Sequence, residues 1–213
     1  MSPRHPRPSI GGRFVLGTLT TLALLAAPAH RAAAQRHLPE PWQRRSTPFV
    51  AVGGDAVFSS VRARATDPRI GDGYGFDVHG SVGVSALSLG GGYQRTEHDL
   101  TGTTQHATYS GFYVEPRVML DLGAGNFMPY IAGRVGRTSV SEPPSLTGNT
   151  AVTHGTTYGA GGGLQVWLAR SVALDLGALW SRIDYSQHRL SASDILRNGE
   201  DGVLLKAGLR LTP

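Results

Sequence analysis

The stretch GLQVWLARSVALDLGALW, residues 163–180, contains two runs in which apolar side chains take every second position. The apolar series of the second run is Val172, Leu174, Leu176, Ala178 and Trp180. Asp175 and Gly177 lie on the opposite face. A period of two is typical of a β-strand with one apolar face. Because glycines in and before the stretch disfavour a helix, it predicts two strands joined by a short turn at 169–171.

The same alternation recurs along most of the chain, in eight runs of roughly 10–14 residues. The runs cover 49–61, 73–86, 87–96, 108–120, 127–140, 158–168, 172–184 and 202–212. Long polar connections at 62–72, 97–107, 141–155 and 186–199 alternate with short ones near 86–88, 121–126 and 169–171. This rhythm is typical of an up-and-down meander with two different ends. We therefore expect an all-β fold, an eight-stranded antiparallel transmembrane β-barrel, over residues 48–213.

The first 34 residues have the form of a cleavable secretory signal peptide. Three arginines precede an apolar stretch at 14–27, and small residues follow before Gln35. The apolar stretch is short for a membrane-spanning helix, which needs about 20 residues. We expect cleavage after Ala34, with 35–47 as an exposed periplasmic leader. The chain has no cysteine, so its folding after export needs no disulfide.

The basic isoelectric point does not indicate a nucleic-acid partner. The net charge is +5, and the first 34 residues carry four arginines and no acid. The remainder is therefore nearly neutral, and its arginines are scattered among acids. A nucleic-acid-binding protein needs a clustered basic face, so we expect no nucleic-acid binding.

The composition of the non-apolar face of the predicted strands indicates whether the apolar face lies inside or outside the barrel. A soluble barrel has apolar side chains inside, whereas a membrane barrel has them outside because lipid cannot hydrogen-bond polar groups. The non-apolar face is poor in charge, rich in glycine and balanced in acids and bases, as expected for a narrow lumen in which charges must pair. The predicted lumen charge network is Asp55, Asp77, His79, Glu115, Arg117, Arg134, Asp175, Lys206 and Arg210. The predicted lipid-facing residues include Val82, Leu164, Leu174, Leu176, Trp180, Val203 and Leu205.

Aromatic residues gather near the ends of the predicted strands, as in the girdles of membrane barrels. Those toward the long connections are Phe58, Tyr74, Phe76, Tyr93, Tyr109, Phe112, Tyr158 and Trp180. Phe49 and Phe127 lie toward the short connections.

With these features, residues 48–212 resemble the small outer-membrane β-barrel family, the eight-stranded barrels similar to the membrane domain of outer-membrane protein A and to outer-membrane protein X. The resemblance rests on the pattern of strands and not on a diagnostic motif. Members of the family usually end the last strand with an aromatic residue, whereas this chain ends in LRLTP. The resemblance implies insertion by the barrel-insertion machinery.

Other candidate chemistry is weaker. His79 and Ser81 share a face, and some barrels of the family are lipid A-modifying enzymes with a His and a Ser, but residues two apart on a strand lie about 7 Å apart. His98, His106, His154 and His188 lie in or beside the long connections without metal-site spacing. The GAGGG run at 159–163 lacks the residues of a phosphate loop and is expected to make room in a packed lumen. We expect no catalytic residue, metal or cofactor.

The sequence thus predicts a monomeric, non-enzymatic protein embedded in outer-membrane lipid, with both termini periplasmic. Its expected role is structural, or surface interaction with an unidentified ligand through the four long connections. The alternatives are a narrow porin-like channel, a lipid A-modifying enzyme and a soluble periplasmic lipocalin-like barrel.

Overall fold

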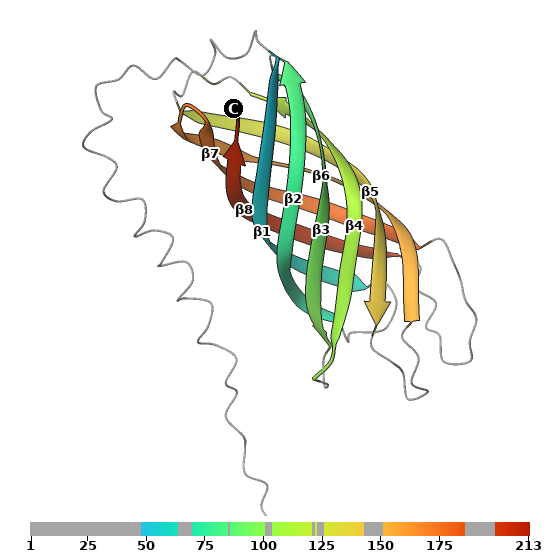
Figure 1. Cartoon of the computed structure of the whole chain (residues 1–213). Coiled ribbons are helices and arrows are strands. Elements are labelled where there is room, and N and C mark those ends of the chain that lie inside the picture. Colours follow the sequence, from blue (N-terminus) through green and yellow to red (C-terminus); the bar gives the residue numbers. More distant parts are fainter. Residues whose placement is uncertain are drawn as a thin grey trace, which may run out of the picture. The chain divides into compact units, whose positions relative to one another are not determined.

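The computed structural model describes residues 48–63, 70–84, 86–100, 104–120, 122, 126–142, 151–185 and 199–213. These residues form a closed barrel of eight antiparallel strands, each hydrogen-bonded to its neighbours in chain order (Figure 1). The expected fold class is therefore confirmed. The expected signal peptide at 1–34, the leader at 35–47 and His188 lie outside the described residues.

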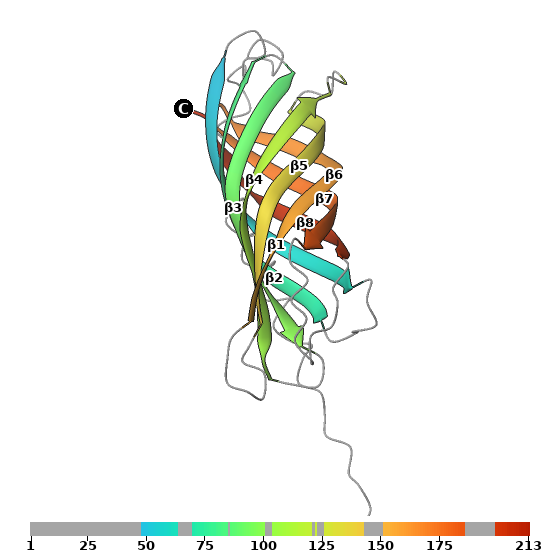
Figure 2. The ribbon, with the colours of Figure 1, turned by 90° about the vertical axis from the view of Figure 1, so that its right-hand side faces the viewer.

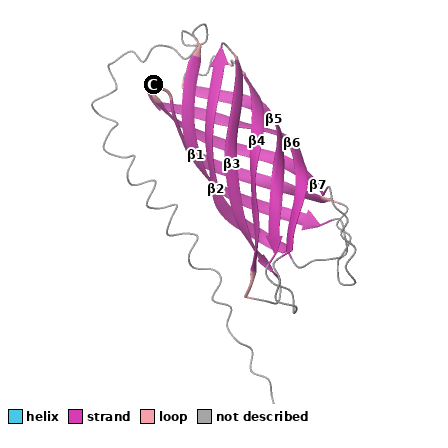
Figure 3. Cartoon of the chain, turned by 45° about the vertical axis from the view of Figure 1, so that its right-hand side comes forward, coloured by secondary structure: helices cyan, strands magenta, loops and turns pink. Residues whose placement is uncertain are grey.

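All of the secondary structure in the described ranges is strand and turn (Figure 3). The strands are β1 (Phe49–Ala63), β2 (Ile70–Val84), β3 (Leu87–Leu100), β4 (His106–Met119), β5 (Phe127–Glu142), β6 (Ala151–Ala169), β7 (Val172–Tyr185) and β8 (Glu200–Leu211). Within these ranges, no helix has the length and apolarity needed to cross a membrane.

The register of the strands fixes the tilt of the barrel. Most strand residues have a partner on the next strand, and a path of partners can be followed once around the closed sheet. A path that starts at Phe49 passes Gly83, Ser88, Arg117, Ala132, Gly161, Leu179 and Leu204 and returns to β1 at Ser59. The return is displaced by ten residues along β1. A stagger of this kind goes with strands tilted by about 35–45° and with an interior just wide enough for side chains.

The two ends of the barrel differ. The short connections β2–β3, β4–β5 and β6–β7 lie at one end, together with the start of β1 and the end of β8 (Figure 2). At the other end, the strands run further than the alternation predicts. Residues 97–100 and 106–107, expected in a connection, belong to β3 and β4, and the connections expected at 62–72 and 141–155 also lose residues to strands.

A buried apolar cluster explains the longer strands. Ala107, Tyr109, Val140, Ile183 and Tyr185 pack together inside the barrel at the long-connection end. Their outward neighbours are mostly polar, so the strand ends look like loop in the sequence although their inward residues are packed and their backbone groups are paired.

The outer surface of the barrel is apolar. Val82, Trp180, Val203 and Leu205 are between 45% and 55% exposed, and Leu176 is 39% exposed. Leu164 and Leu174 point the same way and are half-buried. All seven residues predicted to face lipid thus lie on the outer surface, whereas the nine residues of the predicted lumen charge network are buried. This arrangement is the reverse of a soluble barrel.

Outward aromatic rings form a belt near the long-connection end. Phe58 and Tyr74 have ring centroids 5.2 Å apart, Phe76 and Tyr93 6.4 Å, and Tyr93 and Phe112 5.2 Å. The belt thus runs across β1 to β4 through contacting rings. On the other side of the barrel, Tyr158 on β6 lies two residues from Ala160, which pairs with Trp180 on β7.

Two aromatic residues do not belong to this surface. Tyr109, expected in the girdle, is 4% exposed and lies inside the barrel. Phe49 also has inward parity, since its ring lies 5.5 Å from the Arg210 guanidinium carbon. Both rings cover buried polar groups, and this contact outweighs the tendency of aromatic residues to lie at an interface.

Glycines on the inward face make room for large side chains. Gly163 and Gly177 are partners across β6 and β7. A Cβ on Gly163 would lie 2.5 Å from the Tyr130 hydroxyl oxygen, and one on Gly177 would lie 2.8 Å from it. The missing side chains therefore allow the Tyr130 ring to cross the interior.

Candidate functional site

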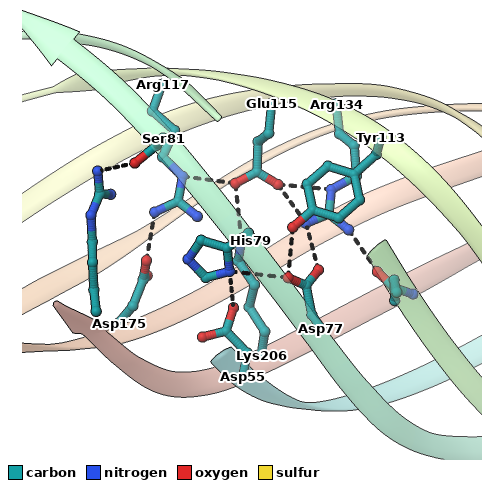
Figure 4. Close-up of polar contacts among 12 residues, drawn as sticks. Asp55, Asp77, His79, Ser81, Tyr113, Glu115, Arg117, Arg134, Asp175 and Lys206 are labelled. Atoms are coloured by element: carbon teal, nitrogen blue, oxygen red, sulfur yellow. Dashed lines mark hydrogen bonds and ion pairs between the residues drawn. The ribbon is translucent and has the colours of Figure 1, made fainter. Parts of the chain in front are cut away.

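The nine side chains predicted to form the lumen charge network all lie inside the barrel, and each is at most 7% exposed. They come from β1, β2, β4, β5, β7 and β8, and they form a layer across the interior (Figure 4). Charges buried this deeply must be paired, because desolvation costs several kcal/mol per ion. The number of hydrogen bonds that each carboxylate accepts differs across this charge layer.

Glu115 on β4 is the centre of the layer. It accepts hydrogen bonds from Arg117 Nε at 2.7 Å, Arg134 Nε at 2.7 Å and Lys206 Nζ at 2.9 Å. Arg134 Nη2 lies 2.5 Å from its second oxygen. One carboxylate thus joins three cations from β4, β5 and β8.

Asp175 on β7 extends this network. It accepts hydrogen bonds from Arg117 Nη1 at 2.5 Å and from the Tyr130 hydroxyl at 2.7 Å. The Arg117 guanidinium also lies 4.6 Å from the centroid of the Tyr130 ring. Arg117 therefore bridges two acids that lie on β4 and β7, well apart in the closed sheet.

Asp55, Asp77 and His79 form a separate group on β1 and β2. His79 Nδ1 lies 3.0 Å from Asp77 Oδ1 and 3.7 Å from Asp55 Oδ2. Asp77 Oδ1 also accepts a hydrogen bond from the Tyr113 hydroxyl at 2.6 Å. Both oxygens of Asp55 are buried without a hydrogen-bond partner.

The structure does not bring His79 and Ser81 together as a nucleophile and its base. His79 contacts Asp77, and the Ser81 hydroxyl accepts a hydrogen bond from Arg210 Nη2 at 2.6 Å. The expectation that residues two apart on a strand are too far apart to bond is nevertheless wrong as a general rule. Inward residues two apart do bond where the side chains are long enough to lean along the strand, as between Glu115 and Arg117.

Sequence reasoning missed several members of the interior. Tyr113 and Tyr130 share the inward parity of their neighbours and could have been found from it. Glu200 was not found because it lies between the expected connection at 186–199 and the expected strand at 202–212, whereas β8 begins at this residue. Its carboxylate is buried and accepts hydrogen bonds from the hydroxyls of Tyr109 at 2.9 Å and Tyr185 at 2.6 Å.

The described histidines near the long connections do not share a site. His98 contacts Thr96 Oγ1 and the Gly71 carbonyl. His106 contacts Asp99 at 2.9 Å, and His154 contacts Ser139 at 2.8 Å. Each imidazole thus has its own partner.

Buried apolar clusters lie inside the barrel together with the charge layer. Met119, Met128, Tyr130 and Ala132 pack at the short-connection end, and Val57, Leu179 and Leu204 pack toward the other end. A cavity of about 60 Å³ is lined by residues that include Tyr109, Tyr113, Arg134, Leu179 and Leu204. This volume holds only a few water molecules. The interior is therefore mostly filled by side chains.

A closed eight-stranded barrel with a charged interior and an apolar exterior defines the fold of the small outer-membrane barrel proteins. Comparison with solved structures finds this fold in Neisserial surface protein A, with a TM-score of 0.60 and 16% identity over 76% of this chain and 96% of that chain. Ail of Yersinia pestis, solved in complex with the heparin analogue sucrose octasulfate, matches with a TM-score of 0.49 and 14% identity, covering 76% and 98% of the two chains. OprG of Pseudomonas aeruginosa matches with a TM-score of 0.46 and 11% identity, covering 79% and 97%. No protein-family model matches the sequence, and no curated protein matches it. The likeness is one of fold.

Proposed function

We propose that this protein is a non-enzymatic barrel of the outer membrane, with a closed interior and with both ends of the barrel segment on the periplasmic side. The observation that carries the proposal is the inverted distribution of side chains. Large apolar residues on every strand are exposed on the outer surface, while nine ionisable residues are buried inside. In water, such a surface would be far larger than the apolar patches of a soluble monomer. In lipid, it is the expected surface of a spanning barrel.

The aromatic belt supports the same proposal. Tyr and Trp side chains prefer the boundary between lipid and water. On the outer surface, Arg95 and Arg137 lie beside this belt: Arg95 pairs with Phe76, and Arg137 pairs with Phe112. The belt therefore fits the upper boundary of an apolar band, with charged side chains beginning at its edge.

Cell fractionation tests the proposed location. We expect the mature chain to sediment with outer membranes, to resist extraction by alkaline carbonate and to dissolve only in detergent. Because a closed barrel stays folded in SDS without heating, the unboiled protein should migrate differently from the boiled protein on a gel. A soluble periplasmic protein from the same cells serves as the control. Recovery of the mature chain with that control protein would contradict the proposal.

Within this proposal, the role is that of a membrane-embedded scaffold that presents the connections at 62–72, 97–107, 141–155 and 186–199 to the exterior, as a monomer. The connecting residues 64–69, 101–103, 143–150 and 186–198 lie outside the described residues. Support for an interaction role comes from their polar composition and from the flanking strands, which end at the same end of the barrel, since binding residues are concentrated on loops held by a rigid scaffold.

A narrow channel is the second candidate function, and the packed interior argues against it. We expect the purified protein to give no discrete conductance steps in planar lipid bilayers, because the charges pair with one another and leave no wide water path. A general porin added afterwards to the same bilayer serves as the positive control. Steps whose size changes in an Arg134→Ala variant would contradict a closed interior, since Arg134 lines the cavity.

The lipid A-modifying alternative receives no support from the described residues. His79 and Ser81 are both buried within the barrel, whereas lipid would contact its outer surface. The Ser81 hydroxyl is bonded to a cation and not to a base.

A further inference from the structure

Two carboxylates face each other directly inside the barrel. Asp55 on β1 and Asp77 on β2 are cross-strand partners, and both point inward. They are 4% and 1% exposed. Like charges at directly opposed positions destabilise a sheet, and burial strengthens their repulsion because the interior has a low dielectric constant. A pair of this kind requires a positive charge between or beside the two groups.

The cations of the charge layer are largely held elsewhere. Lys206 Nζ donates to Glu115, and Arg117 donates to Glu115 and Asp175. Arg134 donates to Glu115 and Gln94, and it approaches Asp77 Oδ2 only at 3.5 Å. Asp55 therefore has none of these cations within ion-pair distance, and His79 is the basic group that faces both carboxylates.

Polar atoms of the group also lack hydrogen-bond partners. Both oxygens of Asp55, Oδ2 of Asp77 and Nε2 of His79 are buried without one. Leaving a buried polar atom unpaired costs about 1–3 kcal/mol, and more for a charged group. Nε2 of His79 lies on the other side of the ring from Nδ1, the nitrogen that contacts both carboxylates. The unsatisfied carboxylate oxygens, however, indicate that a bound cation completes the group.

The three side chains have the donor set and the spacing of a metal site. Ligand atoms from Asp55, Asp77 and His79 lie within 4.8 Å of one another. A tetrahedral Zn²⁺ ion with bonds of about 2.0–2.1 Å holds its ligand atoms roughly 3.3 Å apart. His79 Nδ1 lies 3.0 Å from one carboxylate and 3.7 Å from the other, so small movements would bring both to this spacing.

A further contact resembles the outer shell of a metal centre. Ligating carboxylates are usually held by a hydrogen bond from a neighbouring group. The Tyr113 hydroxyl, from β4, donates to Asp77 Oδ1 at 2.6 Å. This contact fixes the orientation of the Asp77 carboxylate beside His79.

From these observations, we propose that Asp55, Asp77 and His79 bind one divalent transition-metal ion, of the Zn²⁺ class, within the barrel. One imidazole and two carboxylates form a ligand set suited to Zn²⁺ and its neighbours in the first transition row. The two carboxylates neutralise the charge of the ion, and the ion in turn removes the repulsion between the two carboxylates. The ion would thus join β1 and β2 at the middle of the barrel.

Cobalt substitution tests the proposal. The full mature chain is refolded in detergent with EDTA or with Co²⁺, and unbound metal is removed. We expect one Co²⁺ per folded chain, with the intense visible absorption of a tetrahedral site, and loss of this absorption when Zn²⁺ is added. Variants Asp55→Asn and His79→Gln should bind Co²⁺ at least tenfold more weakly. Heat-dependent gel mobility reports whether each variant has folded.

The matched control is His106→Gln, which removes an exposed imidazole that also contacts an aspartate. This variant should bind Co²⁺ as the wild type does. Absence of bound Co²⁺ in the folded wild type would overturn the proposal, and so would binding that survives in both Asp55→Asn and His79→Gln or that disappears in His106→Gln. If the interior variants do not fold, unfolding in urea decides the question. Zn²⁺ should raise the midpoint of the wild type and of His106→Gln equally, and no increase would reject the site.

Discussion

Replacing Glu115 with alanine is expected to lower the free energy of unfolding by about 3–5 kcal/mol, the range for breaking a buried ion pair. Glu115 is 1% exposed and joins Arg117, Arg134 and Lys206. Its removal leaves three buried cations close together. Arg117 keeps Asp175, but Lys206 loses the acceptor of its 2.9 Å hydrogen bond.

Equilibrium unfolding in urea, with the protein in lipid vesicles, measures this effect. Glu97→Gln is the matched control, because Glu97 pairs with Arg95 at 2.9 Å while both side chains are about half-exposed. An exposed pair contributes less than about 1 kcal/mol. Equal losses in the two variants would show that the interior network does not stabilise the barrel more than a surface pair does.

Replacing Leu176 with arginine is expected to cost about 2–4 kcal/mol, the range for arginine at the bilayer midplane on the lipid face of a barrel. Leu176 points outward on β7, four residues after Val172 at the start of the strand and four residues before Trp180 in the aromatic belt. It therefore lies midway across the apolar band, where a guanidinium has no water to solvate it.

The same unfolding experiment in vesicles measures the effect, and Val152→Arg is its control. Val152 also points outward and is 53% exposed. It lies on β6 six residues beyond Tyr158, toward the long-connection end, where water is accessible. We expect Val152→Arg to change stability by less than about 1 kcal/mol. A negligible cost for Leu176→Arg would mean that the mid-barrel surface does not contact lipid.

The alternation of side chains predicted most of the architecture. On a strand, the direction of each side chain is fixed by its parity, so the Leu174–Asp175–Leu176 run already separates an outer from an inner face. The same parity gave the inward position of all nine charged residues. The prediction was wrong where a residue was placed by its chemical type and not by its odd or even position along the strand. Tyr109 was assigned to the girdle because it is aromatic, although its parity is inward. Glu200 and Asp201 are polar and fall outside the expected strand at 202–212, although β8 begins at Glu200.

The sequence by itself therefore determined the strands, their number and the two faces, because these depend on local backbone geometry with a period of two. Only the tertiary structure decided which inward groups meet. Glu115 and Lys206 lie 91 residues apart in the chain and become partners across the interior. Their contact depends on closure of the sheet and on its stagger of ten residues, from Phe49 to Ser59. These are properties of all eight strands together, so no single stretch of sequence encodes them.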